Sequence, residues 1–137
     1  MRTYAPADPA TSRLLNSYAV QQGLEIDSAS ALAPVDMLVD GKYRLRLRAL
    51  PQGGVSIVSR LRSLPDAGGQ RDELILRVSQ MALGMMKEHA STCVIDESER
   101  AIWLQQTVSG NSTQDIDEAV GSFVNALAFW SKAITST

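Results

Sequence analysis

The sequence predicts an α+β fold with elements in the order α-β-β-β-α-β-β-α, in which helices pack a twisted, mainly antiparallel sheet. Two observations predict it. Three segments carry apolar residues at helical spacing, and the segments between them alternate apolar and polar residues or form short apolar runs bounded by turn residues. A chain of 137 residues has the usual size of one domain, so we expect residues 1–137 to form a single domain, with residues 1–8 disordered.

The first helix is predicted over residues 9–22. Asp8 suits the N-cap, because its carboxylate accepts hydrogen bonds from free backbone amides, and Pro9 suits the first helical position. Gly23 is a natural C-terminal cap. The apolar residues of this helix share one side: Leu14, Leu15 and Tyr18.

A meander of three strands is predicted next, over residues 35–39, 42–50 and 55–64. Asp40 and Gly41 form the strongest short hairpin signal between the first two strands. Apolar and basic residues alternate along the second strand, which indicates one buried face.

Arginines occupy the other face of these strands. Arg44, Arg46 and Arg48 alternate with Leu45 and Leu47. If the hairpin keeps its apolar faces together, the third strand extends both faces, with Val55, Ile57 and Leu61 on the apolar one and Arg60 and Arg62 on the basic one. The arginine row is either a solvated sheet face or a surface for an acidic or extended polypeptide. Nucleic acid is disfavoured because no aromatic residue of these strands shares the arginine face to stack on bases.

The second helix is predicted to follow the loop at residues 65–69 and to run to about residue 88. Asp72 and Glu73 suit its positive N-terminal end. Its apolar residues cover most of its circumference, whereas a surface helix needs an apolar stripe of only about 100°. We therefore expect two coverings, the helix's own sheet and a further surface.

The last three elements are strands over residues 92–96 and 101–108 and a long helix from about residue 113. The two strands flank a turn at residues 97–100. The helix carries apolar residues at spacings of 4, 3, 4, 3 and 4: Ile116, Val120, Phe123, Leu127, Trp130 and Ile134. Phe129 falls off this stripe, so we expect it to be exposed and to be a candidate contact residue.

The residues give no sign of an enzyme, a metal site or a cofactor. His89 and Cys93 are the only residues of their types, which is too few for a soft-ligand metal site. The glycine pairs match neither a phosphate loop nor a dinucleotide fingerprint. The chain shows no secretory signal and no membrane span, so we expect a cytoplasmic protein that does not bind membranes. A net charge of −2 also argues against nucleic acid as the partner.

Two segments resemble a known family. They are the hairpin Val39-Asp40-Gly41-Lys42-Tyr43, with the following Leu45 and Leu47, and the closing segment 123–130. Together with the element order, they resemble the class I chaperones of bacterial type III secretion effectors, over residues 9–134. The strand arginines are not a feature expected throughout that family.

The resemblance implies a homodimeric chaperone in the bacterial cytoplasm. It would bind the N-terminal segment of a secreted effector and keep it extended and secretion-competent without ATP, partly by strand addition at a sheet edge. A nucleic-acid-binding module using the strand arginines, or a small-ligand sensor of the same fold, remains the alternative.

The resemblance also suggests which residues bind. We assign effector binding to helix one, the second strand and the last helix, through Leu14, Leu15, Tyr18, Leu45, Leu47, Arg44, Arg46 and Phe129, with a plain core role as the alternative for the leucines and the tyrosine. We assign a symmetric dimer interface to the second helix, through Leu74, Val78, Met81 and Met85.

Overall fold

The computed structural model describes residues 8–24, 34–66, 68–85, 91–109 and 111–135. Its elements are α1 (Pro9–Gln21), β1 (Val35–Val39), β2 (Tyr43–Ala49), β3 (Val55–Ser63), α2 (Gly69–Met85), β4 (Thr92–Asp96), β5 (Ala101–Val108) and α3 (Thr113–Thr135). The predicted order of elements is confirmed. The expected end of the second helix near residue 88 lies outside the described residues, as do residues 1–7 of the segment expected to be disordered.

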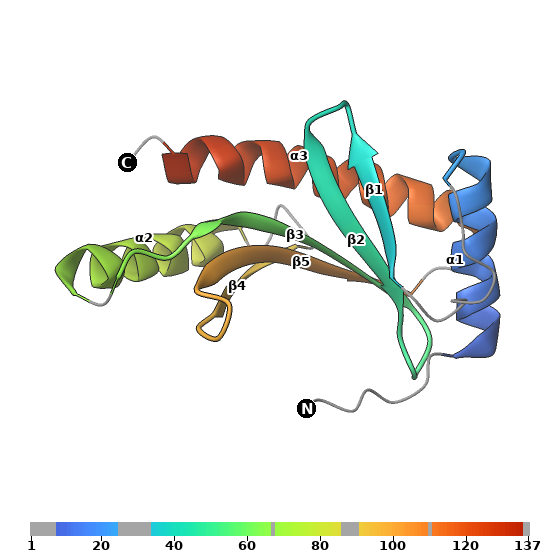
Figure 1. Cartoon of the computed structure of the whole chain (residues 1–137), viewed down its shortest axis with the longest axis horizontal. Coiled ribbons are helices and arrows are strands. Elements are labelled where there is room, and N and C mark those ends of the chain that lie inside the picture. The colour runs from blue at the N-terminus through green and yellow to red at the C-terminus, as the bar shows by residue number, and fades with distance from the viewer. Residues whose placement is uncertain (1–7, 25–33, 67, 86–90, 110, 136–137) are drawn as a thin grey trace.

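The five strands form one antiparallel sheet in the order β1-β2-β3-β5-β4. β1 and β4 are therefore its two edges. Figure 1 shows α3 running along the sheet, α1 crossing at one end of the molecule and α2 lying beside β4 at the other. The predicted meander of β1, β2 and β3 is confirmed.

The hydrophobic core lies between the helices and one face of the sheet. Residues of all three helices join the inward residues of the strands in a single cluster. The largest buried side chains are Trp130, Tyr18, Phe123, Leu45 and Leu47. The predicted stripe of the last helix is wholly buried, since each of its six members is at most 5% exposed.

Local signals in the sequence act as predicted at the ends of the first helix and at the first hairpin. The Asp8 carboxylate accepts hydrogen bonds from the Thr11 amide at 3.0 Å and the Thr11 hydroxyl at 2.8 Å. These bonds lower the pKa of Asp8, the hydroxyl bond having the larger effect. Gly23, just after α1, has φ of 73°, and the hairpin turn places Asp40 and Gly41 at φ of 56° and 64°. Such left-handed backbone favours Gly and tolerates Asp.

A β-bulge in β3 corrects one expectation about the arginine row. The pairing of β3 with β5 shifts between Arg60 and Arg62, so that Arg60 lies opposite Trp103 and Arg62 opposite the fully buried Ile102. The extra residue moves Arg62 to the helix-covered face of the sheet, because strand side chains alternate between faces. The expectation that Arg62 stands beside Arg44 is therefore wrong.

Candidate partner-binding surfaces

Four of the residues expected to bind an effector lie in the core. Leu15, Tyr18, Leu45 and Leu47 are each at most 3% exposed, which agrees with the alternative role left open for them. The Tyr18 hydroxyl donates a hydrogen bond to Asp117 Oδ1 at 3.0 Å, which ties α1 to α3. Burial, and then this bond, raise the pKa of Tyr18.

The other two apolar members of that set are accessible. Leu14 is half-buried and lines a hollow of about 660 Å³ between the start of α1 and the Gly53–Gly54 turn. Phe129 is 40% exposed, as its place off the main stripe predicted, and its ring packs edge-on against Trp130 with the ring centres 5.9 Å apart. The two residues lie on different helices, α1 and α3.

The sheet face that points away from the core carries the arginines, and we call it the open face. Its side chains are exposed or half-buried, and they include Asp36, Leu38, Arg44, Arg46, Arg48, Ser56, Val58, Arg60, Val94, Trp103 and Gln105. Arg46 pairs with Asp36, with Nε 2.9 Å from Oδ1 and Nη2 3.4 Å from Oδ2. This bond raises the pKa of Arg46.

Trp103 is the residue of the open face that sequence reasoning missed. It lies opposite Arg60 on β3 and Val94 on β4. Its neighbours Ile102 and Leu104 are fully buried, so the alternation along the fifth strand was the signal that could have placed it. The indole Nε1 is buried and has no acceptor among the described residues. An aromatic ring therefore does stand beside an arginine, which removes the first of the two sequence-based arguments against nucleic acid and leaves the net charge of −2 as the second.

A hollow of about 410 Å³ lies on the open face. The apolar part of its lining includes Leu38, Val58 and Trp103, and Arg44 and Arg60 supply cationic groups. Leu38 is 55% exposed, a large fraction for a leucine in a strand. The hollow therefore offers apolar contact and guanidinium groups to one ligand.

A second groove follows the β1 edge of the sheet. It has a volume of about 420 Å³ and is bounded by β1, α1 and α3. Met37 and Val39 of the edge strand and Val120 and Val124 of α3 supply its apolar lining. An edge strand offers free main-chain groups, and an extended peptide can add to a sheet at such an edge.

The second helix is only partly covered by its own chain. Of the four residues assigned to a dimer interface, Leu74 and Val78 are at most 7% exposed within the chain and Met81 is half-buried. The side chain of Met85 lies outside the described part. The outward apolar residues of α2 are Leu76, 59% exposed, and Leu83, 72% exposed. The sequence predicts a helix that is apolar on most of its circumference, and this prediction does not distinguish Leu76 and Leu83 from the other apolar residues of α2.

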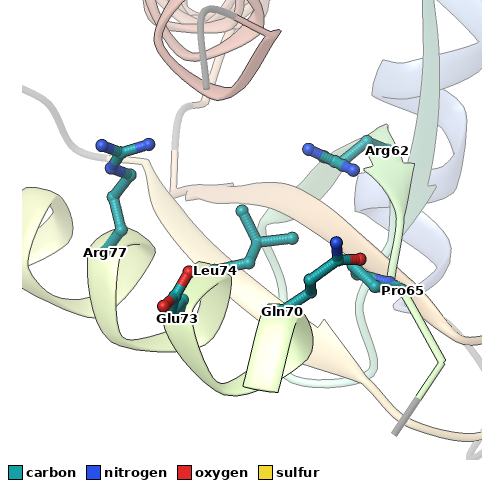
Figure 2. A pocket seen from close by; sticks show the side chains of 6 residues that line it. All are labelled: Arg62, Pro65, Gln70, Glu73, Leu74 and Arg77. Atoms are coloured by element: carbon teal, nitrogen blue, oxygen red, sulfur yellow. The ribbon is translucent and has the colours of Figure 1, made fainter. Parts of the chain in front are cut away.

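A hollow of about 570 Å³ separates the start of α2 from the end of β3. Figure 2 shows Arg62 and Arg77 on opposite sides of it, with Leu74 between them. Leu74 is 7% exposed, so this hollow borders the part of α2 that packs on the core. The packing beneath α2 is thus less complete than that beneath α3.

The described residues hold no chemistry typical of a catalytic centre. Burial raises the pKa of Cys93 to about 12, so its thiol stays protonated at neutral pH and is a poor nucleophile. No group of three or more metal-ligating side chains is found in the part of the chain that the structure describes. The described helices include none that is long and apolar enough to cross a membrane.

Comparison with known proteins identifies the fold. No protein-family model and no curated protein matches the sequence. Among solved structures, the chain is similar to one from the HopA1–SchA chaperone–effector complex, with a TM-score of 0.67 and 12% identity over 90% of this chain and 94% of the other.

Two further solved structures agree. The match to the heterodimeric ExoU–SpcU complex from the type III secretion system of Pseudomonas aeruginosa has a TM-score of 0.65 and 14% identity, over 90% of this chain and 99% of the other. The match to the structure of the Yersinia pestis type III secretion chaperone SycH with a fragment of YscM2 has a TM-score of 0.59 and 16% identity. It covers 88% of this chain and 98% of the other. The chain has a type III secretion chaperone fold.

The match covers nearly all of each chain, so the chaperone fold extends over this protein rather than over one supersecondary unit. The resemblance drawn from the hairpin and the closing segment is confirmed at the level of fold. The open face and the groove at β1 are two surfaces of this fold on which residues of the sheet are accessible.

Proposed function

We propose that this protein is a cytoplasmic chaperone that binds the N-terminal segment of a type III secreted effector and keeps it extended and secretion-competent. In this proposal the protein uses no ATP and catalyses no reaction. The observation that carries the proposal is the shared fold, since two of the chains matched over almost their whole length come from structures of chaperones in complex with other proteins. A shared fold alone is an argument by analogy, so the surfaces of this chain must support it.

The groove at the β1 edge supports strand addition. Its lining combines apolar side chains of β1 and α3 with the outer edge of β1, a five-residue strand that pairs with β2 alone among the described residues. An extended segment gains main-chain hydrogen bonds at such an edge and places alternate side chains in the groove. Leu14 and Phe129 are accessible contacts elsewhere on the chain and stay in the proposed effector-binding set.

The outward side of α2 supports a homodimer. Leu76 and Leu83 are two helical turns apart and therefore share one side of the helix. Exposed leucines in this arrangement are typical of an interface, and a two-fold dimer brings the same surface of each copy together. Met81 and Met85 remain proposed neighbours of this interface, whereas Leu74 and Val78 support the helix from inside.

The chaperone proposal is tested by capture on the tagged protein in the bacterium from which it comes, with and without nuclease. We expect one secreted protein, identified by mass spectrometry, to be held through its N-terminal segment. The complex should form again from the two purified proteins without nucleotide, and deleting the chaperone gene should reduce secretion of that partner. A partner held only through its folded C-terminal part would contradict the proposal.

The dimer proposal is tested by light scattering at micromolar concentration. The wild-type chain should have the mass of two copies, and Leu83→Asp should have the mass of one. Val20→Asp is a matched control, because Val20 is 66% exposed on α1 and lies outside the proposed interface. A monomeric wild-type chain would refute the dimer.

Nucleic-acid binding is the second candidate function, because Trp103 lies opposite Arg60 on the open face. Stacking on an aromatic ring beside a cation is a common way to bind single strands. Nuclease-sensitive material in the capture experiment, with an affinity that falls steeply with salt, would favour this candidate.

A further inference from the structure

The open face combines charge and apolar surface in two rows that run across the strands. One row reads Asp36–Arg46–Val58–Gln105, following the pairing of β1, β2, β3 and β5. The next reads Arg60–Trp103–Val94. Directly opposed residues share a face of the sheet, so each row brings a guanidinium beside an apolar side chain.

The charges on this face are unbalanced. Arg46 has Asp36 as its partner, but Arg44 and Arg60 form no ion pair with any carboxylate among the described residues. Within the part of the chain that the structure describes, Arg60 donates a hydrogen bond to the Ser63 hydroxyl, at 2.7 Å. The chain as a whole carries a net charge of −2, so a basic face is not a consequence of its composition. A ligand that brings carboxylates would supply what the face lacks.

The pairing of the strands limits the backbone conformation that such a ligand can have. β2, β3 and β5 are each paired on both sides, so the middle of the face offers no free main-chain groups for strand addition. A ligand here must bind through its side chains. A helix does this well, because residues at spacings of three and four form one stripe that fills a hollow while its flanks carry charge.

We propose that the open face binds an acidic amphipathic helix of the protein partner. The inference rests on the proposed chaperone function and adds a second site to the edge groove. Apolar side chains of the helix fill the hollow of about 410 Å³ between Leu38, Val58 and Trp103. Carboxylates on its flank pair with Arg44 and Arg60.

The first test uses three synthetic probes and the full-length protein. One probe is a helical peptide with leucines at helical spacing and glutamates on both flanks. The second is the same peptide with lysine in place of glutamate, and the third is a single-stranded DNA oligonucleotide. Trp103 is half-buried whereas Trp130 is 1% exposed, so binding at the open face should change the fluorescence of Trp103. Trp103→Phe should abolish that signal.

We expect the acidic peptide to bind, the lysine peptide not to bind, and the affinity to fall as sodium chloride is raised. The double variant Arg44→Glu/Arg60→Glu should weaken acidic-peptide binding about tenfold or more, since each lost ion pair is replaced by repulsion. Arg13→Glu is the matched control, because Arg13 is an exposed arginine on α1 and should leave binding unchanged. Unaltered circular dichroism and melting temperature show that the variants are folded.

The second test repeats partner capture with the double variant. Loss of the partner with retained folding supports the inference. Equal capture by the wild type and the double variant overturns it and leaves the chaperone function standing. Binding of the acidic peptide without any secreted partner supports the site and counts against the chaperone function. Preference for the DNA probe overturns the inference in favour of nucleic acid.

Discussion

The two longest helices, α3 and α2, differ in how much of their apolar surface the chain itself covers. On α3, Leu127 and Trp130 are at most 2% exposed, within a stripe that the core buries completely. On α2, Leu76 and Leu83 are 59% and 72% exposed, and the inner side of the helix borders a hollow. Apolar composition therefore does not distinguish a helix that holds the fold together from one that offers a surface to another molecule.

The difference suggests a division of roles. We expect the free energy of folding to be concentrated where α3 and α1 pack on the sheet, because burial of apolar surface is the dominant favourable contribution to folding. The α2 side contributes less and leaves apolar surface for association. Leucine-to-alanine substitutions at matched positions test this division directly.

The largest effect is expected for Leu127→Ala on α3. The side chain is 2% exposed in the central cluster, so its removal leaves a cavity that neighbouring groups cannot fill. We expect the free energy of unfolding to fall by about 3–5 kcal/mol, measured by urea denaturation at one protein concentration. A loss below about 1 kcal/mol would show that the packing of α3 contributes little to stability, and the contrast between α3 and α2 would then be wrong.

A smaller loss is expected for Leu74→Ala on the inner side of α2. Leu74 is 7% exposed and lines the hollow of about 570 Å³, so part of its surface has no packing partner to lose. We expect the free energy of unfolding to fall by about 2 kcal/mol, which is the low end of the range for truncating a buried leucine to alanine. Equal losses for the two variants would show that the hollow does not weaken the packing under α2.

The covered half of the molecule was predictable from the sequence. Strict alternation fixed the inward face of the second strand, and the spacing of the last helix identified every buried residue of its stripe. Both patterns reflect a single buried side, so periodicity alone determines which residues lie inside. Turn chemistry at Asp40 and Gly41 likewise determined the first hairpin.

The binding surfaces were harder to predict, because they depend on pairings between distant segments. The bulge that removes Arg62 from the open face is set by how β3 meets β5 and leaves no mark in the alternation of β3 alone. Trp103 reaches the arginines only through that same pairing. The core role of Leu45 and Leu47 could not be separated from a groove role, since both predict an apolar, inward-facing side chain.

A moderate effect is expected at the hydrogen bond that joins α1 to α3. Tyr18→Phe removes the donor to Asp117 while keeping the buried ring. We expect a loss of about 1 kcal/mol in the free energy of unfolding, the usual net value of one hydrogen bond. Asp117→Asn retains an acceptor oxygen and should cost less than Tyr18→Phe. If both variants have the same free energy of unfolding as the wild type, the hydrogen bond does not stabilise the packing of α1 on α3.

The smallest effect on stability is expected for Leu83→Ala on the outward side of α2. The side chain is 72% exposed, and alanine is the better helix former, so the free energy of unfolding of the monomer should change by no more than about 0.5 kcal/mol. Association should respond differently. A wild-type dimer melts at a temperature that rises with protein concentration, and Leu83→Ala should reduce that dependence.

Val20→Ala is the matched control for this last variant, because it also shortens an exposed apolar side chain, on α1. It should leave the concentration dependence of melting unchanged. A loss of several kcal/mol for Leu83→Ala at low protein concentration would mean that the outward side of α2 belongs to the fold of the single chain. The contrast between α2 and α3 would then disappear, because both helices would be stabilised by their own chain alone.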